Sequence, residues 1–207
     1  MIRSIALIAA LVAASAANAS VVVNTIDMEV RNSNYTVTGS ESATGLLNEF
    51  NSGSLVCSQS LTTLSNAGSR QSCSGPIRNI ATRFDIKFTM DAGADVIFEM
   101  GPDYGRGAAV LVGDSATTLT GDYWWGYNWG RTSEIITFTA ENTTGSDLQG
   151  LVTFLGFEGC CGGGMSLRYS TDGGSTWNIA TAVPAPATLV LFGLGLMGAA
   201  FGRRKLA

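Results

Sequence analysis

The stretch Arg83-Phe84-Asp85-Ile86-Lys87-Phe88-Thr89-Met90 alternates polar and apolar side chains over its whole length. Successive side chains of a β-strand point to opposite faces, so this stretch would place its four apolar side chains on one face. Its other face would carry Asp85, Lys87 and Thr89. The alternation is typical of a strand that packs on a core with one face and meets water with the other.

Other short runs rich in β-branched and aromatic residues lie on both sides of this stretch, with Gly, Asn, Asp and Ser between them. Leu148 to Phe157 is apolar on both faces and is therefore expected in the middle of a sheet. Within residues 20–182, only one short helix is expected, near Leu46 to Phe50. The spacing predicts an all-β domain, a single antiparallel β-sandwich. The remaining expected strands are Val21 to Met28, Tyr35 to Thr38, Asp95 to Met100, Ala108 to Val112, Glu134 to Ala140, Ser166 to Ser170 and Trp177 to Ala180.

Residues 1–19 have the three parts of a secretory signal peptide. Arg3 gives a basic start, the stretch from Ile5 to Ala14 is apolar, and Ala17-Asn18-Ala19 is a small-x-small cleavage site. Cleavage is expected after Ala19. The alternative is a retained N-terminal anchor, which needs a longer apolar stretch than this one.

The tail, residues 183–207, has three parts in a fixed order. Pro184-Ala185-Pro186 comes first, residues 187–202 form an apolar run without charge, and Arg203, Arg204 and Lys205 follow. Sixteen helical residues span roughly 24 Å, so a short transmembrane helix is expected at about 187–202, with its basic end on the cytoplasmic side. The alternative is a buried helix of a soluble domain, which usually shows an amphipathic stripe that this run lacks.

This tail closely resembles the PEP-CTERM sorting signal of bacterial surface proteins, with Ala185 at the position where that family has Glu. The resemblance implies that an exosortase-type enzyme cuts near Pro184 and Pro186. It also implies an exported protein that the C-terminal helix holds in the membrane until processing. Afterwards the protein would reside at the cell surface or in the extracellular matrix.

The segment between the two ends, residues 20–182, contains all sixteen acidic residues of the chain. Four of the twelve basic residues, Arg3, Arg203, Arg204 and Lys205, lie outside it, which leaves eight. An acidic surface repels phosphate groups, so nucleic acid is not expected as a partner. The chain has no histidine, which excludes Ser-His-Asp and Cys-His catalysis and histidine-based zinc sites.

The four cysteines should be oxidised after export. We expect a disulfide between Cys57 and Cys73, because it would close a polar loop and stabilise the fold by roughly 3 kcal/mol in the chain-entropy model. Cys160 and Cys161 are adjacent, and the sequence leaves open whether they bond to each other or elsewhere. A catalytic thiolate is not expected, because no histidine is present to activate it.

Aromatic residues recur at every second position in the segment 123–129, namely at Tyr123, Trp125, Tyr127 and Trp129. On a strand they would form one continuous face, and Trp124 would point to the opposite side. If this face is exposed, its rings can stack on sugars; if it is buried, the rings belong to the core. The surrounding glycines favour a loop or an edge. A carbohydrate site at these four residues and a purely structural role both remain open.

Asp103 lies in a glycine-rich turn, and Asp114 follows the strand that comes after it. Two carboxylates at the ends of a hairpin could supply oxygen ligands to Ca²⁺, so a calcium site at Asp103 and Asp114 is one hypothesis. The alternative is ordinary turn chemistry, in which Asp and Gly are common.

The segment 156–164, with Cys160-Cys161-Gly162-Gly163 at its centre, adds a further resemblance. With it, the region 91–177 resembles a group of PEP-CTERM proteins that carry Cys-Cys-x-Gly. The glycine-rich turn and the strand before Asp114 are also similar to the protective-antigen type of β-sandwich found in adhesins and glycosidases. The sandwich is therefore expected to be jelly-roll-like or protective-antigen-like.

Ser170-Thr-Asp172-Gly-Gly-Ser-Thr-Trp177 matches the Asp-box pattern best known from sialidases. The resemblance implies a hairpin in which Asp172 accepts backbone N–H bonds and Trp177 lies under the turn. A single copy implies a hairpin and not a sialidase.

These features together predict a non-enzymatic surface or extracellular-matrix protein that is sorted by an exosortase-type system and binds or associates with exopolysaccharide. The alternative is a purely structural surface protein without a specific ligand. A glycoside hydrolase would need two facing carboxylates about 5–10 Å apart, and the sequence singles out no such pair.

Overall fold

The computed structural model describes residues 20–74 and 76–183. The expected signal peptide with its cleavage site at Ala19, the Pro184-Ala185-Pro186 motif, the expected membrane helix at 187–202 and the basic residues Arg203 and Arg204 lie outside the described residues. Within the described ranges, no helix is long and apolar enough to cross a membrane.

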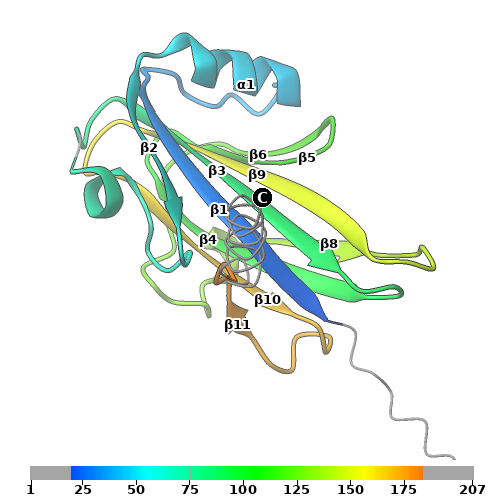
Figure 1. Cartoon of the computed structure of the whole chain (residues 1–207). Helices are drawn as coiled ribbons and strands as arrows, with labels where there is room; N and C mark the ends of the chain where they lie inside the picture. The colour runs from blue at the N-terminus through cyan, green and yellow to red at the C-terminus, as the bar shows by residue number, and fades with distance from the viewer. Residues whose placement is uncertain (1–19, 75, 184–207) are drawn as a thin grey trace, which may run out of the picture.

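Two antiparallel sheets pack face to face (Figure 1), which confirms the predicted β-sandwich. The first sheet has six strands in the order β2 (Leu55–Leu61), β1 (Val21–Asn32), β3 (Ile80–Met90), β9 (Leu148–Glu158), β5 (Ala108–Val112) and β6 (Ser115–Leu119). The second sheet has the order β11 (Asn178–Ile179), β10 (Gly164–Ser170), β4 (Asp95–Tyr104) and β7 (Tyr123–Trp124), and β8 (Ile136–Glu141) also pairs with β4.

Strand β3 contains the alternating stretch that predicted the fold, and it lies between β1 and β9. Phe84, Ile86 and Phe88 are buried against the second sheet, as the alternation predicts. The outward-facing Asp85 accepts a hydrogen bond of 2.6 Å from Thr153 Oγ1 of β9 and pairs with Arg83 at 2.7 Å. The outer face is therefore polar but internally bonded.

The core between the sheets is rich in aromatic side chains. Phe98 of β4 lies at its centre, with ring centroids 5.0 Å from Phe138 of β8 and 5.3 Å from Phe88 of β3. Both sheets thus contribute rings to one contiguous cluster, which also contains Met100 and Phe154. Burial of this apolar surface is the main stabilising term of the fold.

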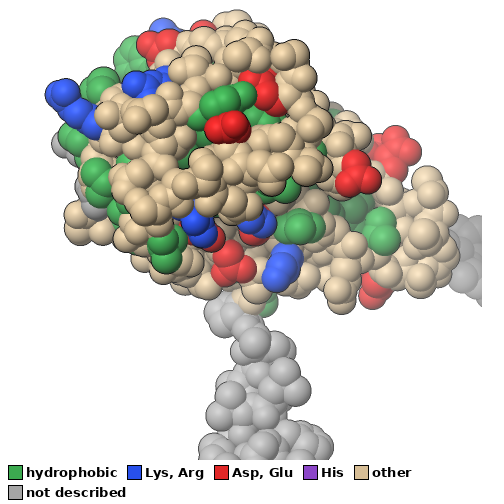
Figure 2. All heavy atoms as spheres, turned by 90° about the horizontal axis from the view of Figure 1, so that it is seen from above, with side chains coloured by type: hydrophobic (Ala, Val, Ile, Leu, Met, Phe, Trp, Pro, Cys, Tyr) green, Lys and Arg blue, Asp and Glu red, His purple; other side chains and the backbone are tan. Residues whose placement is uncertain are grey.

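Helix α1 (Ala43–Ser52) covers the outer face of the first sheet. Ser42 caps it by accepting a hydrogen bond of 3.1 Å from the Gly45 N–H. Leu46 and Phe50 are fully buried in a second cluster that includes Phe157 of β9. This helix explains why β9 is apolar on both faces, and it contains the predicted helical stretch near Leu46 to Phe50. Figure 2 views this side of the molecule, where charged side chains of both signs are scattered and no large hydrophobic patch is seen.

The predicted strand from Tyr35 to Thr38 is wrong, because this segment pairs with no sheet. Its polar groups bind Glu41 instead, which accepts hydrogen bonds from Tyr35 Oη at 2.7 Å and from the Thr38 N–H at 2.6 Å. Three strands were not predicted: the two-residue β7, and β2 and β6. Strands β2 and β6 are edge strands rich in Ser or Thr, so their apolar alternation is weak.

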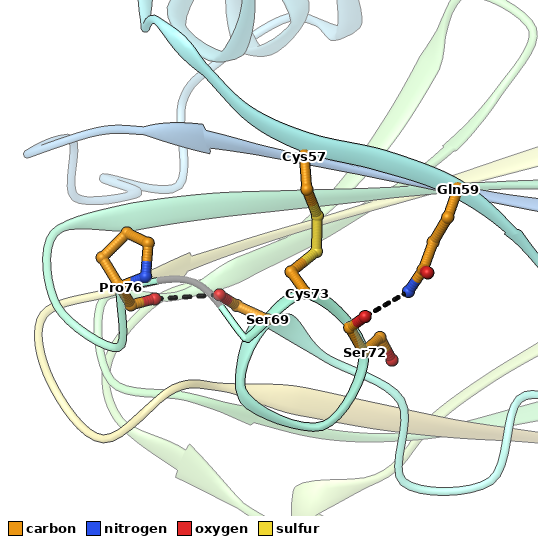
Figure 3. Close-up of a disulfide and its surroundings, with 6 residues drawn as sticks. All are labelled: Cys57, Gln59, Ser69, Ser72, Cys73 and Pro76. Carbon is orange, nitrogen blue, oxygen red and sulfur yellow. Dashed lines mark hydrogen bonds between the residues drawn. A yellow bond between two sulfur atoms is a disulfide. The ribbon is translucent and has the colours of Figure 1, made fainter.

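Cys57 of β2 and Cys73 form a disulfide, as predicted from the sequence. Cys73 ends the short π-helical turn Ser69–Cys73, and the bridge ties this turn to the edge of the first sheet (Figure 3). Gln59 Nε2 donates to the Ser72 carbonyl at 2.8 Å, and Ser69 Oγ donates to the Pro76 carbonyl at 2.9 Å. The first bond and the disulfide thus fasten the loop to β2, and the second bond closes the loop on itself.

The strand register defines two ends of the sandwich. Val21, Met90 and Leu148 pair across the sheet at the end where β1 begins, which we call the terminal end. Asn32 and Glu158 lie at the opposite end, which we call the cysteine end because Cys160 and Cys161 follow directly after β9.

Candidate functional site

The aromatic segment 123–129 is not one strand. Only Tyr123 and Trp124 pair with a neighbour, opposite Tyr104 and Asp103 of β4. Beyond them the chain turns, with positive φ angles at Gly126 and Tyr127. The hypothesis of one continuous face at period two is therefore wrong in its geometry.

Trp125 is buried, although it lies outside the sandwich core. Its ring covers Gly101 of β4, where any side chain would overlap the indole, and the backbone N–H of Trp125 donates to the Pro102 carbonyl at 3.2 Å. The ring centroids of Tyr127 and Trp129 lie 5.4 and 4.6 Å from that of Trp125. Only 4% of Trp125 is exposed, so it serves as the base on which the other rings rest.

These rings lie on the outer face of the second sheet. Val96, Phe98 and Met100 of β4 point into the core, so Glu99 and Gly101 point outward. Arg168 of β10 pairs with Glu99, donating from Nε to Oε2 at 2.7 Å. The ion pair thus belongs to the same outer face as the glycine under Trp125.

Arg168 connects the aromatic segment to the Asp-box hairpin. Its Cζ lies 4.2 Å from the ring centroid of Trp129 and 4.3 Å from that of Trp177. A guanidinium group is attracted to the face of an indole, and Glu99 fixes its orientation. The sequence did not single out Arg168, because no local pattern distinguishes an arginine on a strand that will meet two distant tryptophans.

The Asp-box turn forms as its pattern implies. Asp172 accepts hydrogen bonds from the Thr176 N–H at 2.8 Å, from Thr176 Oγ1 at 2.6 Å and from Ser170 Oγ at 2.7 Å. These bonds to the charged form lower the pKa of Asp172 to about 2. The turn places Trp177 next to Gly174 and against Arg168.

Two aromatic side chains of the segment are well exposed, Trp124 and Tyr127, each at 56%. Trp124 pairs with Asp103, so both side chains leave on the outer face of the sheet. Arg131 lies over the Trp124 ring at 5.2 Å and donates from Nη1 to the Trp124 carbonyl at 2.8 Å. Tyr123 pairs with the buried Tyr104 and is directed to the other side. We call the outer set the aromatic face, which consists of Trp124, Trp125, Tyr127, Trp129, Arg168 and Trp177.

Asp103 and Asp114 do not come together. Asp103 lies near the end of β4, just before β5 begins, and Asp114 lies in the turn after β5. The five residues of β5 separate them by about 16 Å at the usual rise of a strand. The calcium site at this pair stays a prediction, and the separation of the two residues along the chain does not favour it. In residues 20–74 and 76–183, no group of three or more Asp, Glu or Cys side chains is arranged to hold a metal ion.

Asp103 has acidic neighbours at the cysteine end. Burial, together with the charges of Glu158 and Asp122, raises the pKa of Asp103 to about 6. Glu158 is 5% exposed and accepts hydrogen bonds from the N–H groups of Gly105 at 3.0 Å and Cys160 at 2.8 Å. It thereby ties the turn after β4 to the cysteine loop.

The raised pKa of Asp103 predicts a fall in stability with rising pH. The folded state holds this proton up to about pH 6, whereas an ordinary aspartate loses it near 3.8. The protonated Asp103 carboxyl therefore contributes to the stability of the folded state below about pH 4, and this contribution is lost as the pH rises through 6. Compared with the native protein, Asp103→Asn should gain relative stability between pH 4 and 7 in urea denaturation. Asp172→Asn should show no such gain, because the pKa of Asp172 lies below this window.

Cys160 and Cys161, for which the sequence left the pairing open, form a disulfide with each other. Both residues are exposed, and Cys161 has a φ of 75°. The Gly162 N–H donates to the Ile77 carbonyl at 2.9 Å, so the loop is fastened to the chain before β3.

Comparison with known families places a motif at the end of the chain. Residues 182–205 match the PEP-CTERM protein-sorting motif. The chain carries a PEP-CTERM sorting signal. This signal indicates export and sorting to the surface through an exosortase-type system, and it begins at the last two described residues of the sandwich. Comparison with curated protein sequences gives no match.

Several solved structures are similar in fold. The PA14 domain of the antifreeze protein MpAFP has a TM-score of 0.48 at 12% identity, over 78% of this chain and 89% of that one. The PA14 sugar-binding domain of an RTX adhesin has a TM-score of 0.44 at 10% identity, over 78% and 99%. The Epithelial Adhesin 9 A domain of Candida glabrata, in complex with Galb1-4GlcNAc, has a TM-score of 0.49 at 8% identity, over 79% and 90%.

Proposed function

We propose that this PEP-CTERM protein is a non-catalytic surface or extracellular-matrix protein that binds polysaccharide through its aromatic face. The observation that supports this most is the exposure of Trp124 and of Tyr127, whose ring rests on the buried Trp125. Rings held in place before binding lose little conformational freedom when a ligand stacks on them. The flat faces of sugar rings suit such stacking, and several exposed rings can follow a chain of repeating units.

The polar groups of this face suit the same ligand. Glu99 and Asp103 leave on the same side as the rings, and carboxylates are strong acceptors for sugar hydroxyls. Arg131 is exposed beside Trp124 and offers donors. Glu158 is buried and already accepts two backbone hydrogen bonds, so we assign it no catalytic role.

The alternative is a structural protein without a specific ligand, and the stacking of Arg168 on Trp129 and Trp177 is the observation in its favour. These contacts join the aromatic segment to the Asp-box hairpin and would stabilise the second sheet without any ligand. Replacing Trp124 or Tyr127 distinguishes polysaccharide binding from the structural role, because neither ring takes part in the stacking of Arg168 on Trp129 and Trp177.

Binding of the purified domain, residues 20–183, to polysaccharide from the producing cells tests the proposal. We expect Trp124→Ala and Tyr127→Ala each to weaken binding by about tenfold, because each removes an exposed ring of the binding face. Their unfolding free energies should stay within about 0.5–1 kcal/mol of the native value.

Leu55→Ala is the matched control. Leu55 is 57% exposed, but it lies on the edge strand β2 of the first sheet, so its replacement should leave binding unchanged. Native protein that binds none of these polysaccharides, or ring variants that bind as tightly as the native domain, would favour the structural alternative.

A further inference from the structure

The last described residues, 180–183, are built into the sandwich, and we call them the closing segment. Ala180 is fully buried; its N–H donates to the Leu167 carbonyl and its carbonyl accepts from the Leu64 N–H, both at 2.9 Å. The next residues continue this series of backbone hydrogen bonds, which we call the ladder, toward the first sheet. The Ala182 N–H donates to the Thr62 carbonyl and the Val183 N–H to the Val23 carbonyl, again at 2.9 Å.

The closing segment occupies a free part of the β1 edge. Strand β2 ends at Leu61, which pairs with Ile26, so the first residues of β1 have no partner from β2. Val183 bonds to Val23 in this free part, three residues nearer the start of β1. The chain therefore runs toward the terminal end of the sandwich as it leaves the fold.

No spacer separates the fold from the sorting signal. The motif match begins at residue 182, so Ala182 and Val183 belong both to the motif and to the ladder. Pro184 follows directly and has no N–H to donate, so the ladder cannot continue through it. The last backbone hydrogen bond of the described chain is thus one residue away from the Pro-Ala-Pro sequence.

We propose that the closing segment controls access of the sorting enzyme to its cleavage site. This rests on the proposed sorting by an exosortase-type enzyme. An enzyme that cuts a peptide bond near Pro184 must hold the residues before that bond in its own active site. Ala182 and Val183 must therefore release Thr62 and Val23 before cleavage. When such opening is fast, the cleavage rate follows the fraction of molecules that are open.

Insertion of a spacer tests this directly in cells that process the protein. Gly-Ser-Gly-Ser between Val183 and Pro184 lets the enzyme bind without opening the ladder. Breaking two backbone hydrogen bonds lowers the fraction of molecules in which the closing segment is released by a factor on the order of ten. The insertion removes this requirement, so it should speed processing about tenfold in a pulse-chase measurement. The same insertion beside Gly145, an exposed glycine in the loop between β8 and β9, is the control and should change nothing. Equal rates for the native protein and the Val183 insertion would overturn the proposal.

A pair of proline substitutions separates the hydrogen bonds from the length of the chain. Ala182→Pro removes the donor to Thr62 and should speed processing severalfold. Thr181→Pro is the matched control, because the Thr181 N–H donates no hydrogen bond within the described residues. If both variants are folded and processed at the same rate, release of the ladder does not limit access.

A soluble protease separates this proposal from sorting itself. Residues 184–207 are replaced by the recognition sequence of a site-specific protease, either directly after Val183 or after the same four-residue spacer. We expect the direct fusion to be cut about tenfold more slowly, and equal rates would overturn the proposal. If this difference appears but the native protein is never processed in cells, then the proposed sorting fails while the closing segment still restricts access.

Discussion

Trp125→Ala should lower the free energy of unfolding by about 3–5 kcal/mol, the usual loss for removal of a buried indole. Trp125 is 4% exposed and fills the space above Gly101, with Tyr127 and Trp129 resting on it. Its removal would leave a cavity above Gly101 on the outer face of the second sheet. Urea denaturation of the native and variant domains measures the effect.

Trp124→Ala is the natural control, because it removes an indole from the adjacent position. Trp124 is 56% exposed, so its loss should change the unfolding free energy by less than about 1 kcal/mol. The sequence left open which of the two indoles is buried; a sugar-binding face at Tyr123, Trp125, Tyr127 and Trp129 would have required the reverse, with Trp124 buried and Trp125 exposed. Equal losses for the two variants would contradict the geometry of the aromatic face.

Replacing Cys57 and Cys73 together by Ser should lower the unfolding free energy by about 3 kcal/mol. The two cysteines are 16 residues apart, and opening a loop of this size gives the unfolded chain more conformational freedom. The loss should appear as a lower denaturation midpoint under non-reducing conditions. Peptide mapping of the native protein should show the same bridge.

The other pair of cysteines provides the control for this effect. Cys160 and Cys161 are adjacent, so their bond closes no chain loop of appreciable length. Replacing both by Ser should therefore change the unfolding free energy much less than the loss of the first bridge. If the loss from this second pair were the larger one, stabilisation would not follow the length of the loop that each disulfide closes. The chain-entropy explanation of the Cys57–Cys73 bridge would then be contradicted.

The strands that could be predicted from the sequence are those with a clear burial pattern. Strand β3 has one apolar face, and β9 is apolar on both faces because α1 covers the first sheet on the outside. The edge strands β2 and β6 were missed because their Ser and Thr side chains give little contrast between the two faces. Tyr35 to Thr38 has the composition of a strand, but Glu41 satisfies its polar groups locally.

The candidate site was predicted only in part, because its geometry depends on contacts between distant segments. The abundance of rings at 123–129 indicated an aromatic surface, but the sequence left open which rings are buried, and the turn at Gly126 and Tyr127 breaks the expected period-two face. Arg168 and Trp177 joined this surface through contacts that no local spacing encodes. Asp103 and Asp114 were expected at the two ends of a hairpin, but Asp103 belongs to β4 and Asp114 follows β5, which lies in the other sheet.

The most direct test of polysaccharide binding by the sorted protein uses the cells that produce it. Full-length native protein and the double variant Trp124→Ala/Tyr127→Ala are expressed at equal levels, and each is measured in the polysaccharide matrix and in the medium. We predict that the native protein stays with the matrix, whereas the double variant, folded and processed normally, is released to the medium. Equal retention of both proteins in the matrix would contradict binding through the aromatic face.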